Sequence, residues 1–329
     1  MKSKLENLKK HTVVVADTGD FEAIAKYQPK DATTNPSLIL KAAKDSRYKN
    51  LIVNAIEWAG GRQSSGSTLD LVVAKVFVNF GLEILKVVPG RVSTEVDARL
   101  SFDKQKSLSL ARQYIAMYEE MGVSKDRILI KLASTWEGIE TCKELEQEGI
   151  HCNMTLLFNK TQAIAAAEAG ATLVSPFVGR IMDFQKKSEG RDLIPADEDM
   201  GVLSVTDIYN YYKKHGYTTE IMGASFRNIE EIVALCGCDL LTISPDLLEK
   251  LSNSTGEVPR ILSLEEAKIK GGKKVHVDEK KFRWDMNEDA MATEKLSEGI
   301  RNFAKDTRSL EEFLLKNFSI KHTSDAKML

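Results

Sequence analysis

The sequence has little of what a disulfide scaffold or a metal centre requires. Its 329 residues include only four cysteines, and so few thiols in a long chain are typical of a reducing compartment. Cys236 and Cys238 are separated by one residue, a spacing that fits neither a redox motif nor half of a zinc site. We therefore expect free thiols, no metal ion and a cytoplasmic location.

The chain also lacks a large excess of charge and a long apolar run. Its formal net charge is -2, which argues against nucleic acid or an anionic membrane as the main partner. No apolar run approaches the ~20 residues of a membrane-spanning helix, and residues 1–10 contain no apolar core of a secretory signal. We expect a protein that acts on small molecules, with neither nucleic acid nor a membrane as partner.

Short apolar runs, each followed by a helical pattern, recur along the chain. Their length and their lack of helical period are typical of buried strands. We expect strands near 12–17, 31–35, 82–88, 127–133, 151–157, 171–177, 219–225 and 239–244. Alternation of strands and helices indicates a parallel sheet, and eight such units match a closed (β/α)8 barrel of the TIM type. An open doubly wound sheet is the alternative, although no glycine-rich dinucleotide loop follows any strand.

The rest of the chain is expected to add helices to this barrel rather than to form a second domain. We assign residues 1–329 to one domain, with a barrel core at about 10–252, an extension at about 253–317 that packs on the barrel, and a frayed tail at 318–329. Within the extension, residues 287–317 carry the apolar stripe of a long helix. A polar stretch near 184–200 has little periodicity and is predicted to be a loop.

One predicted strand, at 127–133, has a lysine in its middle: Ile128-Leu-Ile-Lys131-Leu-Ala133. Lysine is rarely buried without a partner. Burial favours the neutral amine, which is a nucleophile that can form a Schiff base with a carbonyl. Alternatively, Lys131 has a structural role and pairs with a carboxylate or reaches water at the strand end. The residues at the other strand ends bear on this choice.

Polar side chains gather at the predicted carboxyl ends of the strands, where barrel enzymes hold their active sites. With one phenylalanine among them, they are Asp17, Thr33, Asn35, Glu95, Asn153, Thr155, Ser175, Phe177, Arg180, Ser225 and Arg227. A carboxylate can move protons, and arginines can hold an anion such as phosphate. Three of these residues have structural alternatives, because Asp17 can cap the following turn, Arg227 can pair with a helix carboxylate, and a phenylalanine on an apolar strand, as at Phe177, usually belongs to the core.

Four motifs resemble those of the transaldolase family. They are Asp31-Ala-Thr-Thr-Asn-Pro-Ser37, Val92-Ser-Thr-Glu-Val-Asp-Ala-Arg99, Arg127-Ile-Leu-Ile-Lys-Leu-Ala-Ser-Thr-Trp136 and Ser175-Pro-Phe-Val-Gly-Arg180. The resemblance covers about residues 10–316 and is to the longer type with a C-terminal helix. It implies transfer of a dihydroxyacetone unit from sedoheptulose 7-phosphate to glyceraldehyde 3-phosphate, giving erythrose 4-phosphate and fructose 6-phosphate, in the non-oxidative pentose phosphate pathway. It also implies sugar phosphates as partners, no cofactor, and a homodimer.

The resemblance further implies a role for each site residue. Lys131 would carry the Schiff base, Asp17 would act as acid and base, and Glu95 and Thr155 would hold a water molecule. The substrate would be bound by Thr33, Asn35, Asn153, Ser175 and Phe177, and its phosphate by Arg180, Ser225 and Arg227. Related fructose-6-phosphate aldolases place a tyrosine where this chain has Phe177, so Phe177 and Glu95 favour transfer over release. A Schiff-base aldolase and a barrel that binds sugar phosphate without turnover remain the alternatives.

Overall fold

The computed structural model describes residues 2–62 and 67–320. In these residues eight parallel strands form a closed barrel in sequence order. The strands are Val13–Asp17 (β1), Asp31–Thr33 (β2), Val92–Glu95 (β3), Ile128–Ala133 (β4), Cys152–Leu157 (β5), Leu173–Pro176 (β6), Glu220–Gly223 (β7) and Leu240–Ile243 (β8). Closure is explicit, because β1 pairs with β8 as well as with β2. The predicted TIM barrel is therefore confirmed, and an open sheet is excluded.

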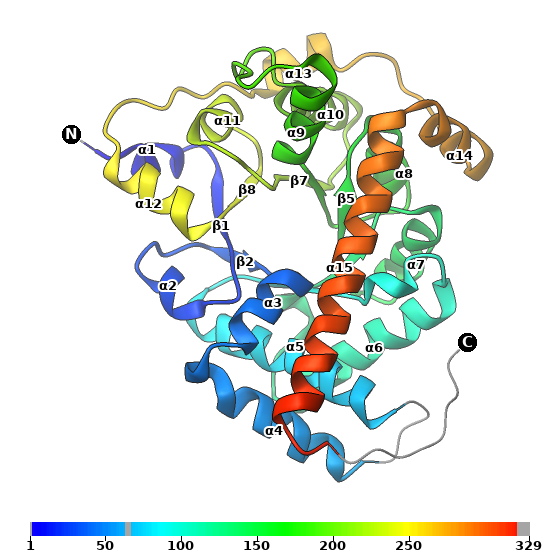
Figure 1. Cartoon of the computed structure of the whole chain (residues 1–329). Coiled ribbons are helices and arrows are strands. Elements are labelled where there is room, and N and C mark those ends of the chain that lie inside the picture. Colours follow the sequence, from blue (N-terminus) through cyan, green and yellow to red (C-terminus); the bar gives the residue numbers. More distant parts are fainter. Residues whose placement is uncertain (1, 63–66, 321–329) are drawn as a thin grey trace.

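Helices follow the strands and surround the barrel (Figure 1). They are Lys4–Leu8 (α1), Phe21–Ala25 (α2), Pro36–Ala43 (α3), Lys49–Gly60 (α4), Thr68–Val87 (α5), Lys104–Glu120 (α6), Trp136–Gln147 (α7), Lys160–Glu168 (α8), Gly179–Glu189 (α9), Met200–His215 (α10), Ile229–Ala234 (α11), Pro245–Asn253 (α12), Leu264–Lys270 (α13), Glu279–Glu288 (α14) and Ala290–Asn317 (α15). Short 3-10 turns lie at Ser46–Tyr48 (η1), Ala98–Leu100 (η2) and Lys125–Arg127 (η3). Among the described helices, none is long and apolar enough to cross a membrane.

The third strand is not where the sequence placed it. Residues 82–88 form the last turns of α5 and the residue after it, and β3 is Val92–Glu95. Every residue from Leu71 to Gly81 in α5 is buried, because this helix packs against α4, α6 and β3. Residues 82–88 at its end are mostly apolar and carry only two charged residues, Glu83 and Lys86, so they resemble a short apolar strand. The prediction of a strand at 82–88 was wrong for this reason.

The predicted loop near 184–200 was also wrong in its first part. The helix α9 extends through it to Glu189 and ends at Gly190, whose φ of 65° is the left-handed conformation that suits glycine. The predicted C-terminal helix is confirmed as α15, Ala290–Asn317. Of the tail predicted to fray, residues 321–329 lie outside the described residues.

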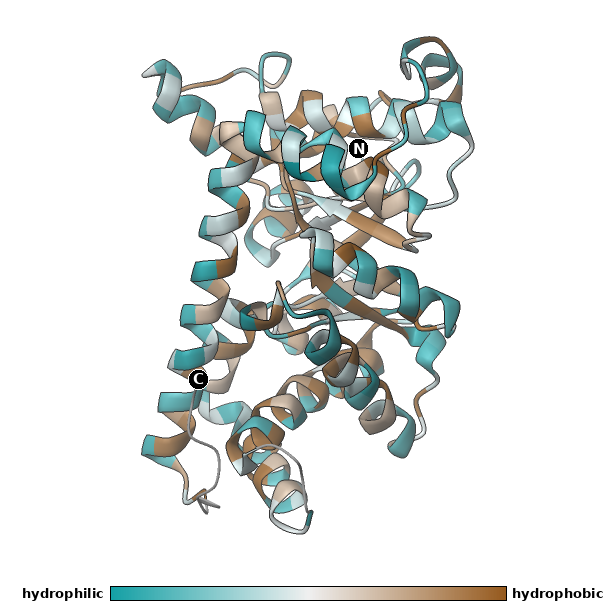
Figure 2. Ribbon diagram, turned by 90° about the vertical axis from the view of Figure 1, so that its right-hand side faces the viewer, coloured by the Kyte–Doolittle hydropathy of each residue, from teal (hydrophilic) through white to brown (hydrophobic). Residues whose placement is uncertain are grey.

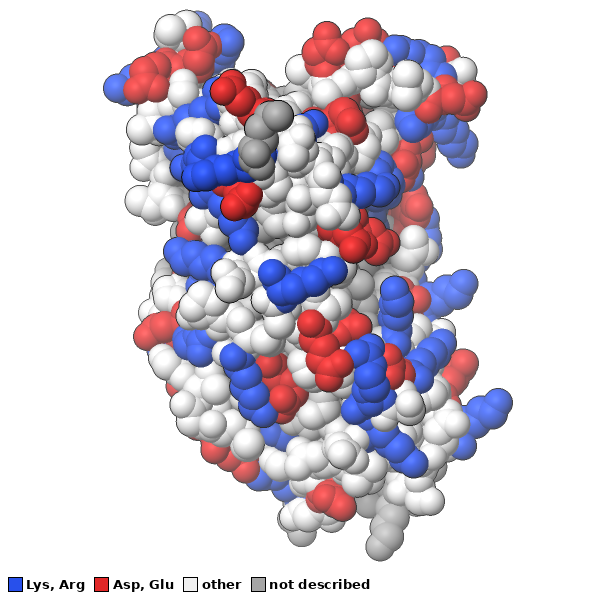
Figure 3. Space-filling model, turned by 90° about the vertical axis from the view of Figure 1, so that its left-hand side faces the viewer, with Lys and Arg blue, Asp and Glu red and all other residues white. Residues whose placement is uncertain are grey.

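The inside of the barrel is packed near the end at which the strands begin. Five apolar side chains from different strands form a cluster of their own: Val15, Leu129, Leu173, Met222 and Leu240. The larger core lies between the outer face of the sheet and the helices. In Figure 2 the strands are mostly hydrophobic and the surrounding helices expose hydrophilic residues. Figure 3 shows lysine, arginine, aspartate and glutamate interspersed over one face of the molecule. The packed cluster closes one end of the barrel and leaves the other end for a site.

The long helix α15 crosses the end of the barrel at which the strands finish (Figures 1 and 2). Gly299 allows this close approach, since a Cβ there would lie 2.6 Å from Leu156 and 3.3 Å from the Arg180 guanidinium. Further along, Glu311 forms an ion pair with Arg99 at 2.6 Å. The C-terminal extension is thus fixed over the barrel mouth.

A tight contact at Gly138 lies directly behind the lysine strand, and we expect Gly138→Ala to destabilise the fold. A Cβ at this position would overlap the backbone oxygen of Ala133, the last residue of β4. Overpacking of this kind costs about 1–3 kcal/mol, which denaturant unfolding would measure. Gly60→Ala is the control, because a Cβ there meets nothing within 4 Å. An equal effect of the two substitutions would contradict the prediction.

Candidate active site

A polar layer lies directly above the packed cluster in the barrel. Side chains two residues apart on a strand point to the same face. The residues two positions after the cluster members Val15, Leu129, Leu173 and Leu240 are Asp17, Lys131, Ser175 and Thr242. The alternation of the strands therefore brings one carboxylate, one amine and two hydroxyls together inside the barrel.

Lys131 is buried and has two partners. Its side chain is 5% exposed, and Nζ lies 3.1 Å from Oε2 of Glu95. Nζ also donates a hydrogen bond of 3.0 Å to the backbone oxygen of Thr34. The β3–β4 register sets Glu95 beside Lys131. The lysine does pair with a carboxylate, as the structural alternative required, but it does so inside the barrel among the other predicted site residues.

Asp17 is held at the end of β1 by a chain of hydroxyl groups. Thr33 donates a hydrogen bond of 2.8 Å to Oδ1 of Asp17, and its hydroxyl lies 2.6 Å from that of Thr242. Burial raises the pKa of Asp17, although the charge of Lys131 opposes this. Burial likewise raises the pKa of Glu95, again against the opposing charge of Lys131. Two carboxyl groups that hold protons more strongly than usual thus flank the amine, and such groups suit acid–base work near neutral pH.

Asn153 and Thr155 lie on β5, next to the lysine strand. Asn153 donates to the hydroxyl of Ser93 at 3.0 Å and accepts from the hydroxyl of Ser175 at 2.6 Å. The hydroxyl oxygen of Thr155 is buried and has no hydrogen-bond partner in the described part of the chain. Leu156, the next residue, has a φ of 51°, a strained conformation for a branched residue. A register shift between Met154 and Leu157 accompanies it.

These side chains surround a cavity of about 220 Å³. Its lining comprises Asp17, Thr33, Asn35, Lys131, Thr155, Ser175, Phe177, Arg180, Ala224, Ser225, Phe226, Arg227, Thr242 and Ser244. Of the predicted site residues, Glu95 and Asn153 do not line it, but they contact Lys131 and Ser175 that do. The structure therefore brings all of the predicted residues together.

Sequence reasoning missed part of the lining. Thr242 was not predicted, although a lone polar residue in the apolar strand Leu240–Ile243 was a usable signal. Ala224 and Phe226 carry no chemical signal of their own, because alanine and phenylalanine in such positions usually belong to the core. Their proximity to the cavity follows from the fold alone.

Two arginines close one side of the cavity. The guanidinium of Arg180 lies over the rings of Phe177 and Phe303, 4.9 and 5.4 Å from their centroids. Burial, and then the nearby charge of Arg227, lower the pKa of Arg180. Arg227 also forms an ion pair of 2.7 Å with Asp183 of α9, so its structural alternative is real as well. Two facing cations at the rim of a polar cavity make an anion site.

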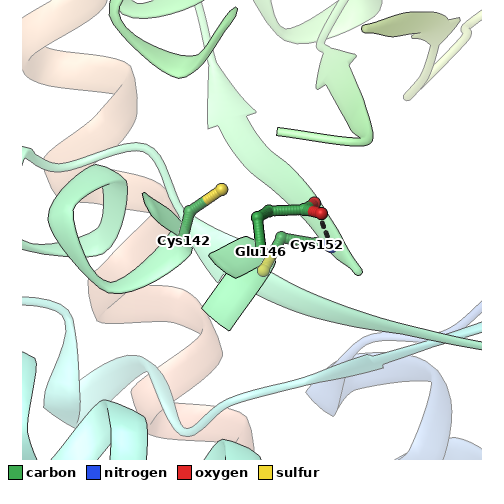
Figure 4. Close-up of side chains that lie close together, drawn as sticks. All are labelled: Cys142, Glu146 and Cys152. Atoms are coloured by element: carbon green, nitrogen blue, oxygen red, sulfur yellow. Dashed lines mark hydrogen bonds between the residues drawn. The ribbon is translucent and has the colours of Figure 1, made fainter. Parts of the chain in front are cut away.

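Outside this cavity, one group of described residues has the composition of a metal site. The sulfur atoms of Cys142 and Cys152 and a carboxylate oxygen of Glu146 lie within 4.8 Å of one another (Figure 4). The carboxylate already accepts hydrogen bonds from the backbone of Cys152 at 2.8 Å and of Thr172 at 2.7 Å. Burial raises the pKa of Cys152, so the thiol keeps its proton. A carboxylate used in this way and a protonated thiol form a structural contact, not a ligand set.

Comparisons with known proteins agree with this geometry. The family model described as "Transaldolase/Fructose-6-phosphate aldolase" matches residues 14–314. A protein of Shewanella sp. (strain W3-18-1) named "Transaldolase" is 58% identical over 320 residues, which is 97% of this chain and 100% of that protein. A protein of Drosophila melanogaster named "Probable transaldolase" is 59% identical over 314 residues, which is 95% of each chain. The chain belongs to the transaldolase/fructose-6-phosphate aldolase family.

Proposed function

We propose that this protein is a transaldolase that moves a dihydroxyacetone unit between sugar phosphates through a Schiff base on Lys131. The donor is sedoheptulose 7-phosphate and the acceptor glyceraldehyde 3-phosphate, and the products are erythrose 4-phosphate and fructose 6-phosphate. The observation that carries the proposal is the buried Lys131 amine, 3.1 Å from the Glu95 carboxylate, in a cavity that two arginines also line. This combination suits a phosphorylated carbonyl substrate.

In the first step the amine attacks the ketone carbon of the donor. The adduct loses its oxygen as water, which leaves an iminium on Lys131. Glu95 and Thr155 serve this step by holding a water molecule that moves protons to and from the adduct. In support, the buried hydroxyl of Thr155 lacks a hydrogen-bond partner among residues 2–62 and 67–320, Glu95 lies 3.1 Å from the Lys131 amine, and the raised pKa of Glu95 allows this group to carry a proton.

In the second step Asp17 takes the proton from the hydroxyl on the fourth carbon. The bond between the third and fourth carbons then breaks, its electron pair moves towards the iminium, and an aldose phosphate leaves. The three-carbon enamine remains on Lys131 until the acceptor aldehyde arrives. Attack by the enamine forms the new bond, and Asp17 returns its proton to the new hydroxyl. Water then adds to the product iminium, which releases the ketose phosphate and the free amine of Lys131. The raised pKa of Asp17 suits both directions.

The binding roles are assigned by position in the cavity. Thr33, Asn35, Ser175 and Phe177 line the cavity and contact the three-carbon unit near Lys131. Asn153 reaches the same unit from beside Ser175, to which it is hydrogen-bonded. Arg180, Ser225 and Arg227 bind the phosphate. The support for the latter is that phosphate sites of barrels of this class usually lie in the loops after the seventh and eighth strands, and Ser225 and Arg227 follow β7.

Borohydride reduction in the presence of fructose 6-phosphate tests the proposal. Reduction of the iminium should add a dihydroxyacetone-derived mass to Lys131, located by peptide mass spectrometry. An unmodified Lys131 would contradict both enzyme hypotheses and leave a protein that only binds sugar phosphate. Cleavage of fructose 6-phosphate that is as fast without erythrose 4-phosphate as with it would instead indicate the aldolase that releases dihydroxyacetone.

We also propose one domain over residues 1–329, a homodimer and a cytoplasmic location. The first is supported by α15, which buries Ile300, Phe303 and Leu310 against the rest of the chain. The homodimer rests on the family, and the buried stripe of α15 means that the contact must use another surface. The four free cysteines support a reducing compartment. Sedimentation equilibrium and fractionation of cells would test the last two proposals.

A further inference from the structure

Two buried carboxyl groups outside the cavity face each other. Asp199, which caps α10, and Glu231, in α11, are each 1% exposed. One oxygen of Asp199 accepts hydrogen bonds from the backbone of Gly201 and Val202, at 2.7 and 3.3 Å. The two remaining oxygens, Oδ2 of Asp199 and Oε1 of Glu231, find no hydrogen-bond partner among the described residues. The two side chains lie close enough for each to shift the pKa of the other.

A direct hydrogen bond between the two groups needs a proton on one of them, because ionised carboxylates only accept. Burial raises the pKa of both side chains, that of Glu231 to about 7. The charged groups nearby are Lys186 of α9, which favours the ionised form of Asp199, and the surface ion pair of Arg227 with Asp183. The pair therefore gives up a proton as the pH rises through about 7.

The second oxygen of Glu231 connects this pair to the cavity. Oε2 accepts hydrogen bonds from the backbone N–H groups of Arg227, at 2.6 Å, and Asn228, at 3.4 Å. The segment it holds begins at Ser225, whose φ of 61° is strained for a serine. The residues 225–227 line the cavity on its anion-binding side. A strained backbone keeps its conformation only if surrounding contacts fix it, and Glu231 supplies such contacts from behind.

We propose that Glu231, buried beside Asp199, is a positioning residue for the substrate's phosphate. It fixes the backbone of the segment 225–228 and so sets where Ser225 and Arg227 meet the anion, without touching the substrate itself. Asp199, at the start of α10, lies against Glu231 and so links this segment to α10. The inference rests on the proposed function, since it assigns a partner to the same cavity.

The test compares a phosphorylated acceptor with an unphosphorylated one. With saturating sedoheptulose 7-phosphate as donor, Glu231→Ala should raise KM for glyceraldehyde 3-phosphate about tenfold and leave kcat within about twofold. KM for glyceraldehyde, which has no phosphate, should stay unchanged. Glu231→Gln keeps an acceptor for Arg227 and offers Asp199 an N–H donor, so it should behave like the unmodified protein at pH 6.5. Glu230→Ala, at the exposed neighbour on α11, is the matched control.

The pH dependence of KM gives a second test, which can be carried out even if Glu231→Ala does not fold. In the unmodified protein, KM for glyceraldehyde 3-phosphate should rise between pH 6.5 and 8.5, because two facing carboxylates repel and loosen the segment. This rise should be absent in Glu231→Gln. Equal effects on both acceptors, or the same pH profile in Glu231→Gln, would make the pair a purely structural contact. Loss of transfer in the unmodified protein would instead overturn the proposed function.

Discussion

Lys131→Met should abolish transfer while the protein stays folded. Methionine has a similar length and no nucleophile, so the covalent route is closed, and we expect turnover to fall on the order of 10⁴-fold or more. Glu95 loses its cation, but burial already raises the pKa of this carboxyl, so it becomes neutral instead of remaining as an unpaired buried charge. Steady-state assays, borohydride trapping and thermal unfolding together measure the outcome.

The chain offers a matched control for this variant in Lys75. That lysine is also buried, at 1% exposure, but it lies in α5 over the Trp58 ring, 5.1 Å from the centroid. Burial lowers the pKa of Lys75, so it too has nucleophilic character without belonging to the barrel cavity. Lys75→Met should retain transfer and trapping. Persistent trapping in Lys131→Met, or loss of cooperative unfolding in it, would support a structural role for Lys131.

Asp17→Asn should separate the two steps of the proposed mechanism. Asparagine can still accept the hydrogen bond from Thr33, but it cannot take a proton, so cleavage of the carbon–carbon bond should slow about 10²- to 10⁴-fold. The Schiff base forms before that step, and borohydride should therefore still trap the donor on Lys131. The trapped adduct should carry the mass of the whole ketose phosphate instead of the three-carbon unit.

The mass of the trapped adduct decides whether Asp17 removes the hydroxyl proton. A three-carbon adduct at the normal rate would mean that another group removes the hydroxyl proton. Asp192→Asn applies the same chemical change to an exposed aspartate in the segment after α9, and it should leave both rate and adduct unaltered. The comparison excludes a general effect of removing one negative charge.

The barrel could be predicted because parallel strands covered on both faces are short and apolar throughout. The lysine strand is the clearest example, since Ile128–Ala133 differs from the sequence prediction by only one residue. The third strand could not be found in this way. Its four residues, Val92 to Glu95, include three polar ones, whereas five of the seven residues at 82–88, just before it, are apolar. Judged by residue type, the end of α5 therefore resembled a buried strand more than β3 did.

The residues of the cavity could be predicted because strand ends converge in a closed barrel. Asp17, Lys131 and Ser175 were all identified in this way. They lie in one layer of the barrel interior because side chains alternate along each strand. Asp199 and Glu231 could not be paired in advance, because nothing in the sequence brings the start of α10 to α11. Their contact exists only after the segment that follows β7 has folded back against α9.

The crossing of α15 over the barrel mouth has a consequence for synthesis of the protein. All eight strands precede residue 244, so the barrel can close while the last part of the chain is still inside the ribosome. Phe303, which lies against the Arg180 guanidinium, and Gly299, which makes room for it, emerge later. A nascent chain with a finished barrel therefore still lacks the contacts between α15 and Arg180, so the position of this guanidinium is fixed only once α15 has been made.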